Sequence, residues 1–107
     1  MLALSEARKT IGHGPTGWGY QMTHTSAMLA ALDPISAGAE ELFDLGLKYC
    51  LGQGVEADLV EAHKWFNISA LKGSETAKTY RRELSREMTS TQVAQAQRKA
   101  RALITLH

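Results

Sequence analysis

Residues 39–73, AEELFDLGLKYCLGQGVEADLVEAHKWFNISALKG, decide the fold of this chain of 107 residues. Leu42, Leu45 and Tyr49 recur at the spacing of one helix face, and acidic and basic residues occupy the other face. The turn Gly52-Gln53-Gly54 predicts the end of this helix, because glycine readily takes the positive φ that closes a helix end. A second apolar pattern follows the turn, so the stretch predicts two antiparallel helices, an αα-hairpin.

Capping signals predict the ends of both helices. Asp33-Pro34 and Ser36 can each begin the first helix, and Ser36 is favoured, which gives a helix from Ser36 to about Leu51. Asp58 is a good N-cap, and Glu61 three residues later forms a variant of the capping box with it. The second helix is therefore predicted to run from Leu59 to about Lys72.

Gly46 is an unusual residue for the middle of a helix. A helical glycine costs roughly 0.5–1 kcal/mol relative to alanine, so its presence indicates that a second helix approaches closely. We expect the small side chain of Ala62 to face Gly46. Trp65 and Phe66 in the second helix are then core residues rather than an aromatic ligand box.

The hairpin resembles one complete Sel-one-like repeat, a relative of the tetratricopeptide repeat. The residues that carry this resemblance span both helices and the turn: Leu45, Gly46, Tyr49, Gly52, Gly54, Val55, Asp58, Ala62, Trp65, Ala70 and Gly73. Glu41 and Ser69 stand where the family usually has alanine. The resemblance implies a stacked helical scaffold that binds another protein and has no catalysis of its own. It also implies that the first helix of each pair forms the binding surface, which nominates Glu40, Asp44, Lys48, Lys78, Arg81 and Arg82.

Residues 74–106 predict a second, degenerate hairpin that closes the stack. Ser74 can cap its first helix, and Thr89 with Gln92 forms a capping box for its second. Arg81-Arg82 stands where the repeat has Leu-Gly, and no glycine turn follows. The two expected buried stripes are Ala77, Tyr80, Leu84 and Met88 in the first helix, and Val93, Ala96, Ala100, Leu103 and Ile104 in the second. The predicted fold is all-α, a short right-handed solenoid of two antiparallel helix hairpins within residues 26–107.

The N-terminal part of the chain does not follow the repeat pattern. We expect residues 1–25 to form a flexible or loosely packed arm, with a docking strand anchored by Trp18 and Tyr20 as the alternative. His13 and His24 have no cysteine or carboxylate at ligand spacing, so no metal site is expected. Residues 26–32, SAMLAAL, predict one or two helical turns that cover the open end of the stack.

Composition and charge limit the classes of function. A formal charge of +1 argues against a chain-wide polyanion binder, and a single cysteine excludes a disulfide-stapled scaffold. No apolar run reaches the length of a membrane span and no signal peptide is evident, so a bacterial-type cytoplasm is expected. Residues 38–73 hold six acidic and three basic side chains, a net charge of −3, whereas residues 74–107 hold three acidic and seven basic, a net charge of +4. This division reflects either ordinary solvated helix faces or a basic face for an acidic partner.

No group of residues predicts catalysis. His63 lies beside Glu61 and Trp65 in sequence, and a dyad with Cys50 would need contact across the hairpin and an orienting third group. We therefore expect a packed histidine, an inert cysteine, no cofactor and no enzyme. The leading hypothesis is a protein-interaction module, a small adaptor or scaffold, and the alternative is a binder of nucleic acid or another acidic ligand through the basic C-terminal hairpin.

The chain is also not expected to work as an isolated monomer. About three stacked repeats are normally needed for stability, and this sequence offers one faithful repeat and one degenerate pair. A homodimer or a docked protein is expected to cover the apolar side chains left at the ends. The candidates for exposure are Phe43, Leu47, Leu103, Ile104 and Leu106.

Overall fold

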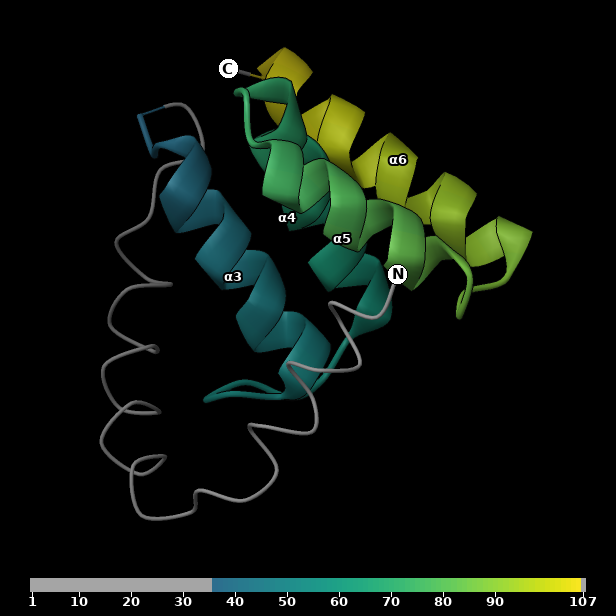
Figure 1. Cartoon of the computed structure of the whole chain (residues 1–107). Coiled ribbons are helices and arrows are strands. Elements are labelled where there is room, and N and C mark those ends of the chain that lie inside the picture. Colours follow the sequence, from purple (N-terminus) through teal and green to yellow (C-terminus); the bar gives the residue numbers. More distant parts are fainter. Residues whose placement is uncertain (1–35, 107) are drawn as a thin grey trace, which may run out of the picture.

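The computed structural model describes residues 36–106, and these residues form four α-helices and no strand. The helices are α3 (Ala39–Leu51), α4 (Leu59–Leu71), α5 (Glu75–Ser85) and α6 (Ser90–Leu106) (Figure 1). The all-α prediction is confirmed for this part of the chain. The expectations for the arm of residues 1–25, for residues 26–32 and for Asp33-Pro34 lie outside the described residues.

The first helix begins three residues later than the sequence indicated. Gly38, not Ser36, is the N-cap of α3, and its backbone N–H donates a hydrogen bond of 2.9 Å to Glu41 Oε1. Ser69 Oγ donates a second hydrogen bond, of 2.6 Å, to the backbone carbonyl of Ala39. Glu41 and Ser69, the two departures from the repeat pattern, therefore both bind the backbone at the start of α3.

The turn between α3 and α4 has the predicted geometry. Gly52 and Gly54 both have positive φ, 72° and 76°, and Gly52 ends α3. Asp58 caps α4 by accepting a hydrogen bond of 3.1 Å from the Glu61 backbone N–H. The capping box is incomplete, because the Glu61 carboxylate binds lysines instead.

The caps of the second pair are confirmed. Ser74 Oγ accepts a hydrogen bond of 3.0 Å from the Ala77 backbone N–H at the start of α5. Thr89 and Gln92 form the full reciprocal box at the start of α6, with distances of 3.1 Å and 2.9 Å. Each of these side chains satisfies a backbone group that the helix itself leaves unpaired.

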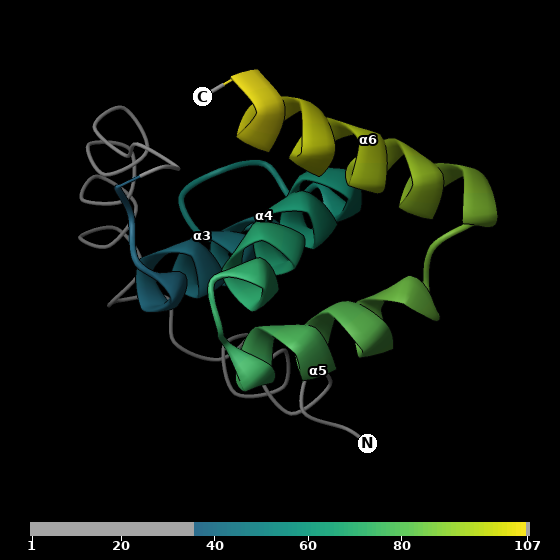
Figure 2. The same ribbon diagram turned by 90° about the horizontal axis from the view of Figure 1, so that it is seen from above.

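Helix α4 is the central element, and α3, α5 and α6 pack around it (Figures 1 and 2). Figure 2 shows α4 between α5 and α6, which diverge from the short connection that joins them. Helices α5 and α6 each pack more extensively on α4 than on one another. The second pair is thus more open than the first.

Close packing of α3 on α4 depends on Gly46. Gly46 is buried, and a Cβ atom at this position would lie 2.5 Å from Cδ1 and Cε1 of Phe66. The prediction of a close approach is confirmed, but the residue that occupies the space is the Phe66 ring and not Ala62. Phe66 also lies near Phe43 and Tyr80, with ring centroids 5.7 Å and 5.8 Å away, so that one aromatic cluster joins three helices.

The core has two parts. The larger part contains Cys50 of α3, Phe66 of α4, Leu84 of α5 and Ala96 of α6, so all four helices contribute to it. The smaller part lies at the end of the molecule where α3 begins and α6 finishes, and it contains Ala37, Leu42, Ile68 and Ala100. Of the first predicted stripe, Ala77 and Leu84 of α5 are buried, as is Met88 just after this helix, and Tyr80 is half-buried. Ile104, at the end of the stripe predicted for α6, is exposed.

Three polar residues of α4 bind neighbouring helices. Ser69 binds the start of α3, as described above. His63 lies 2.9 Å from Ser85 of α5, and Asn67 Oδ1 accepts a hydrogen bond of 2.7 Å from Arg81 of α5. Because α4 has neighbours on several sides, His63 Nε2, Asn67 Oδ1 and Ser69 Oγ bind protein groups instead of water.

Candidate functional site

A groove lies between the C-terminal halves of α4 and α6. Its volume is about 540 Å³, within the range of small-molecule and peptide sites. Two residues of α4 and five of α6 line it: Asn67, Leu71, Gln97, Ala100, Arg101, Ile104 and Thr105. The groove therefore lies on the open side of the second helix pair.

The apolar part of the groove is accessible to a ligand. Leu71 is 67% exposed and Ile104 is 46% exposed, and they are the two large apolar side chains that are exposed among residues 36–105. Ala100 lines the groove between them and is itself almost fully buried. Two exposed aliphatic side chains at one hollow are typical of a docking surface, whereas a single exposed one would need no explanation.

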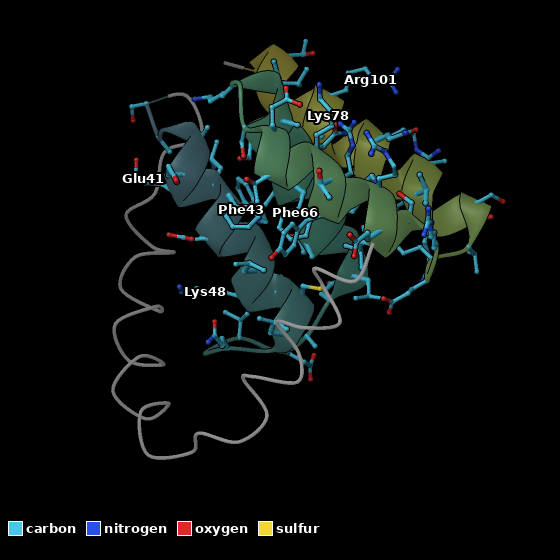
Figure 3. All side chains as sticks on the ribbon, in the orientation of Figure 1. Glu41, Phe43, Lys48, Phe66, Lys78 and Arg101 are labelled. Atoms are coloured by element: carbon cyan, nitrogen blue, oxygen red, sulfur yellow. The ribbon has the colours of Figure 1, made fainter. Side chains whose placement is uncertain are left out.

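The groove also has a positive electrostatic bias. Among the described residues that line it, Arg101 is the one charged side chain, and none is a carboxylate. Helix α6 contains Arg98, Lys99 and Arg101 and no acidic residue. Within residues 36–106, Lys99 pairs with Glu61 at 3.3 Å, while Arg98 and Arg101 form no ion pair. Figure 3 shows the Arg101 side chain extending outward from α6.

The partner-binding residues predicted on α3 form one stripe. Glu40, Asp44 and Lys48 follow each other at intervals of four residues, on the face of α3 opposite buried Leu42 and Gly46. Figure 3 shows Lys48 pointing away from the other helices. Partial burial raises the pKa of Asp44, Lys48 opposes this effect, and Glu40 adds to it.

The predicted residues on α5 have different roles. Lys78 pairs with Glu75 at 3.3 Å, and Arg81 is held by Asn67 against α4. Arg82 is exposed. The α3 stripe faces away from the core and Arg81 faces α4, so the six nominated residues do not form one continuous surface.

His63 is a structural residue in this fold. Its side chain is only 1% exposed, and its contact across the helices is with Ser85 and not with Cys50. The Ser85 hydroxyl donates to the Arg81 carbonyl at 2.9 Å, which makes His63 Nε2–H the donor to Ser85 Oγ. His63 Nδ1 has no hydrogen-bond partner among residues 36–106. Such an imidazole neither accepts the serine proton nor has an orienting carboxylate, so it does not activate Ser85.

Burial lowers the pKa of His63 to about 4, and the positive charge of Arg81 adds to this effect. The side chain is therefore neutral at pH 7. Cys50 is buried in the larger core. No cluster of three or more metal-binding side chains occurs within the described part of the chain.

The sequence did not clearly predict the two exposed apolar residues of the groove. Ile104 was a candidate for exposure, but it was also assigned to the buried stripe of α6, and Leu71 was not singled out at all. The one signal for Leu71 was its position directly before Lys72 and the Gly73 turn, at the end of a helix.

Comparisons of the chain with models of known families, with curated proteins and with solved structures gave no match. None of the helices in residues 36–106 is long and apolar enough to cross a membrane.

Proposed function

We propose that this chain is a non-enzymatic protein-interaction module, a small adaptor or scaffold of the Sel-one-like type. Its working surface is the groove between α4 and α6, which receives an aliphatic segment of another protein. The observation that carries this proposal is the exposure of Leu71 and Ile104 on either side of the groove. Every other large apolar side chain whose burial is described is buried or half-buried.

The lining of the groove favours a peptide as ligand. Leu71 and Ile104 offer apolar contact, and Asn67 and Gln97 offer amide groups that can bind a peptide backbone. Arg101 adds one cation at the rim. Alternating apolar and hydrogen-bonding groups of this kind suit an amphipathic segment with a carboxylate near its aliphatic side chains.

The helix arrangement supports the view that the chain works with a neighbour. In a right-handed solenoid of helix pairs, each pair is covered by the next, and the last pair needs a cap. The open pair α5–α6 leaves the end of α4 uncovered on one side. A docked protein or a second copy of the chain would supply the missing neighbour.

The proposal is tested by affinity capture with the tagged full chain, compared with two matched variants on the last turns of α6. Ile104→Asp places a charge in the groove, and Ala102→Asp places the same charge on an exposed residue that does not line it. We expect one protein to be captured in stoichiometric amount by the wild type and by Ala102→Asp. Its affinity for Ile104→Asp should fall about tenfold or more, since a central apolar contact is worth at least about 1–2 kcal/mol. Equal capture by both variants would contradict the proposal.

The predicted stripe on α3 is a separate candidate for the partner surface. Exchanging the charges of Asp44 and Lys48 (Asp44→Lys with Lys48→Glu) keeps the net charge and alters the stripe. If the stripe contacts the partner, the exchange should weaken capture and leave the far-UV circular dichroism spectrum unchanged. Unchanged capture would assign binding to the groove alone.

A binder of nucleic acid or another acidic ligand is the second candidate. It is favoured by the absence of acidic residues from α6, where Arg98 and Arg101 form no ion pair with a described residue. Binding to random duplex DNA should then weaken steeply between 50 and 200 mM salt, and the charge reversals Arg98→Glu and Arg101→Glu should reduce the salt dependence. The groove offers no aromatic side chain on which a base could stack, which makes this candidate second.

A further inference from the structure

The groove lies beside the point where the described chain begins. Lys72 Nζ donates a hydrogen bond of 2.8 Å to the backbone carbonyl of Ala37, and Lys72 directly follows the groove residue Leu71. Ala37 is buried in the same cluster as Ala100, which also lines the groove. Figures 1 and 2 show the start of α3 and the end of α6 at the same end of the molecule. The residues that precede Ser36 therefore join the fold next to the groove.

Residues 26–35, SAMLAALDPI, have the composition that the groove would bind. Met28, Leu29 and Leu32 are aliphatic, and Asp33 is the one charged residue of the segment. The groove presents two aliphatic side chains, one guanidinium and no carboxylate. A segment with a single carboxylate next to its aliphatic side chains matches this lining in both polarity and charge.

The length of the chain allows this contact within one molecule. An extended chain spans at most about 3.3–3.6 Å per residue, so Leu32 can lie up to roughly 14 Å from Ser36. Met28, eight residues before Ser36, can lie up to roughly 28 Å away. One lysine side chain bridges the distance from α4 to Ala37, which brings the Leu71 end of the groove within this reach.

We propose that residues 26–35 of this chain bind in the groove between α4 and α6 of the same molecule. The aliphatic side chains cover Leu71 and Ile104, and Asp33 pairs with Arg101. This inference rests on the proposed function of the groove as a docking surface. It adds that residues 26–35 compete with the partner protein for the groove. A tethered segment acts at a high effective concentration, of millimolar order for a short linker, so a partner protein must displace it to bind.

The test is disulfide trapping in the full-length chain. Ala31→Cys places a thiol within the segment, and Thr105→Cys places one at the exposed rim of the groove. The oxidant is oxidised glutathione, and products are separated by non-reducing electrophoresis and assigned by peptide mass mapping. The single variants control for disulfides with the buried Cys50.

The decisive control adds Ile104→Asp to the same cysteine pair. This change alters the groove but not the length of chain that connects the two cysteines. The rate of disulfide formation should therefore fall if the segment binds in the groove, and stay the same if the cysteines meet only because the chain connects them. We expect an intramolecular disulfide in the wild-type groove, formed at least about tenfold faster than in the Ile104→Asp background. Arg101→Asp should slow trapping, and Asp33→Arg should restore it in the same molecule.

The other outcomes overturn the inference. Equal rates in both backgrounds, or no trapping, would show that the segment does not occupy the groove. A disulfide that joins two molecules would mean that a second copy covers it. If trapping fails while Ile104→Asp still abolishes partner capture, only this inference is wrong. If trapping succeeds and partner capture is insensitive to Ile104→Asp, the groove serves the chain itself and the proposed function is wrong.

Discussion

The helix pair α3–α4 and the helix pair α5–α6 differ in how closely their members pack. The eighth residue of α3 is Gly46 and the eighth of α4 is Phe66, and the Phe66 ring fills the space that a Gly46 side chain would need. The eighth residues of α5 and α6 are Arg82 and Gln97, and both are exposed. The first pair thus has an interlocking contact that the second pair lacks.

The connection within the first helix pair also differs from the connection within the second. Residues 52–58 join α3 to α4, and the loop is fixed by two left-handed glycines and by a hydrogen bond of 2.9 Å from the Asp58 N–H to the Tyr49 carbonyl. Residues 86–89 join α5 to α6 without a glycine, and buried Met88 belongs to the larger part of the core. Beyond this short connection, α5 and α6 lie on either side of α4 (Figure 2).

The groove lies where the two helix pairs meet. The α5–α6 pair has no contact like that of Gly46 with Phe66, and α4 lies between α5 and α6 (Figure 2). Leu71 of α4 and Ile104 of α6 are exposed where these two helices line the groove. The first pair contains the interlocking contact of Gly46 with Phe66, whereas one helix of each pair lines the groove.

The largest loss of stability is expected when the Phe66 ring, which packs against Gly46, is removed. Phe66→Ala should lower the free energy of unfolding by about 3–5 kcal/mol, because Phe66 is fully buried and contacts both Phe43 and Tyr80. Urea denaturation followed by circular dichroism measures the change. Ile104→Ala in the open pair is the control and should change stability by less than about 0.5 kcal/mol. Equal losses would mean that the two pairs are equally packed.

The second prediction concerns His63, which joins α4 to α5. Because its pKa is lowered to about 4 in the folded state, the unfolded chain binds the proton more readily between pH 6.5 and pH 4. Stability from this residue is present above about pH 6.5 and is lost as the pH falls. The expected loss between pH 7 and pH 5 is about 2 kcal/mol.

A glutamine at this position provides the control. His63→Gln keeps an N–H donor for Ser85 and removes the titration, so its stability should change little between pH 7 and pH 5. Glu61 does not interfere with this comparison. Burial alone would raise the pKa of Glu61, but Lys64 and Lys99 outweigh burial and lower it, so the stability that Glu61 contributes is lost only below about pH 4.5. A wild-type curve that is flat between pH 7 and pH 5 would show that His63 is not desolvated.

Local signals in the sequence predicted most of the fold within residues 36–106. Side-chain caps at Asp58, Ser74 and Thr89 act within three residues, and the structure contains all of them. The helical period correctly identified the buried stripe of α5. Gly46 indicated a close helix contact, because no other residue type fits under a neighbouring ring.

What the sequence did not predict depends on contacts between distant residues. Ser36 looked like a helix start, but Glu41 and Ser69 stabilise a start at Ala39, and Ser69 is thirty residues away from it. The groove depends on how α6 lies against α4, which no local pattern encodes. The repeat pattern also assumes a closed second pair, so it offered no reason to single out Leu71.

The third prediction tests the close contact at Gly46. Gly46→Ala should destabilise the chain by about 1–2 kcal/mol, because overpacking against the buried Phe66 ring exceeds the gain in helix propensity. Gly38→Ala is the matched control, since its Cβ would lie an ordinary 3.7 Å from Glu41 Oε1. The control should cost less than about 1 kcal/mol. A Gly46→Ala protein at least as stable as the wild type would mean that α3 and α4 do not interlock here.

The smallest effect is expected at Lys99, which joins the open helix α6 to α4. Its ammonium lies 3.3 Å from Glu61 Oε2, while Lys64 binds the other carboxylate oxygen at 2.8 Å. Lys99→Met keeps the aliphatic stem and leaves Glu61 paired with Lys64, so the global stability should fall by less than about 1 kcal/mol. The loss should appear mainly as faster amide hydrogen exchange in α6, and it should diminish at high salt because this side chain is 46% exposed. The corresponding change on α5, Lys78→Met, breaks only a pair within one helix and should leave exchange in α6 unaltered. Similar exchange in α6 for both variants would show that α6 is held by its apolar stripe alone.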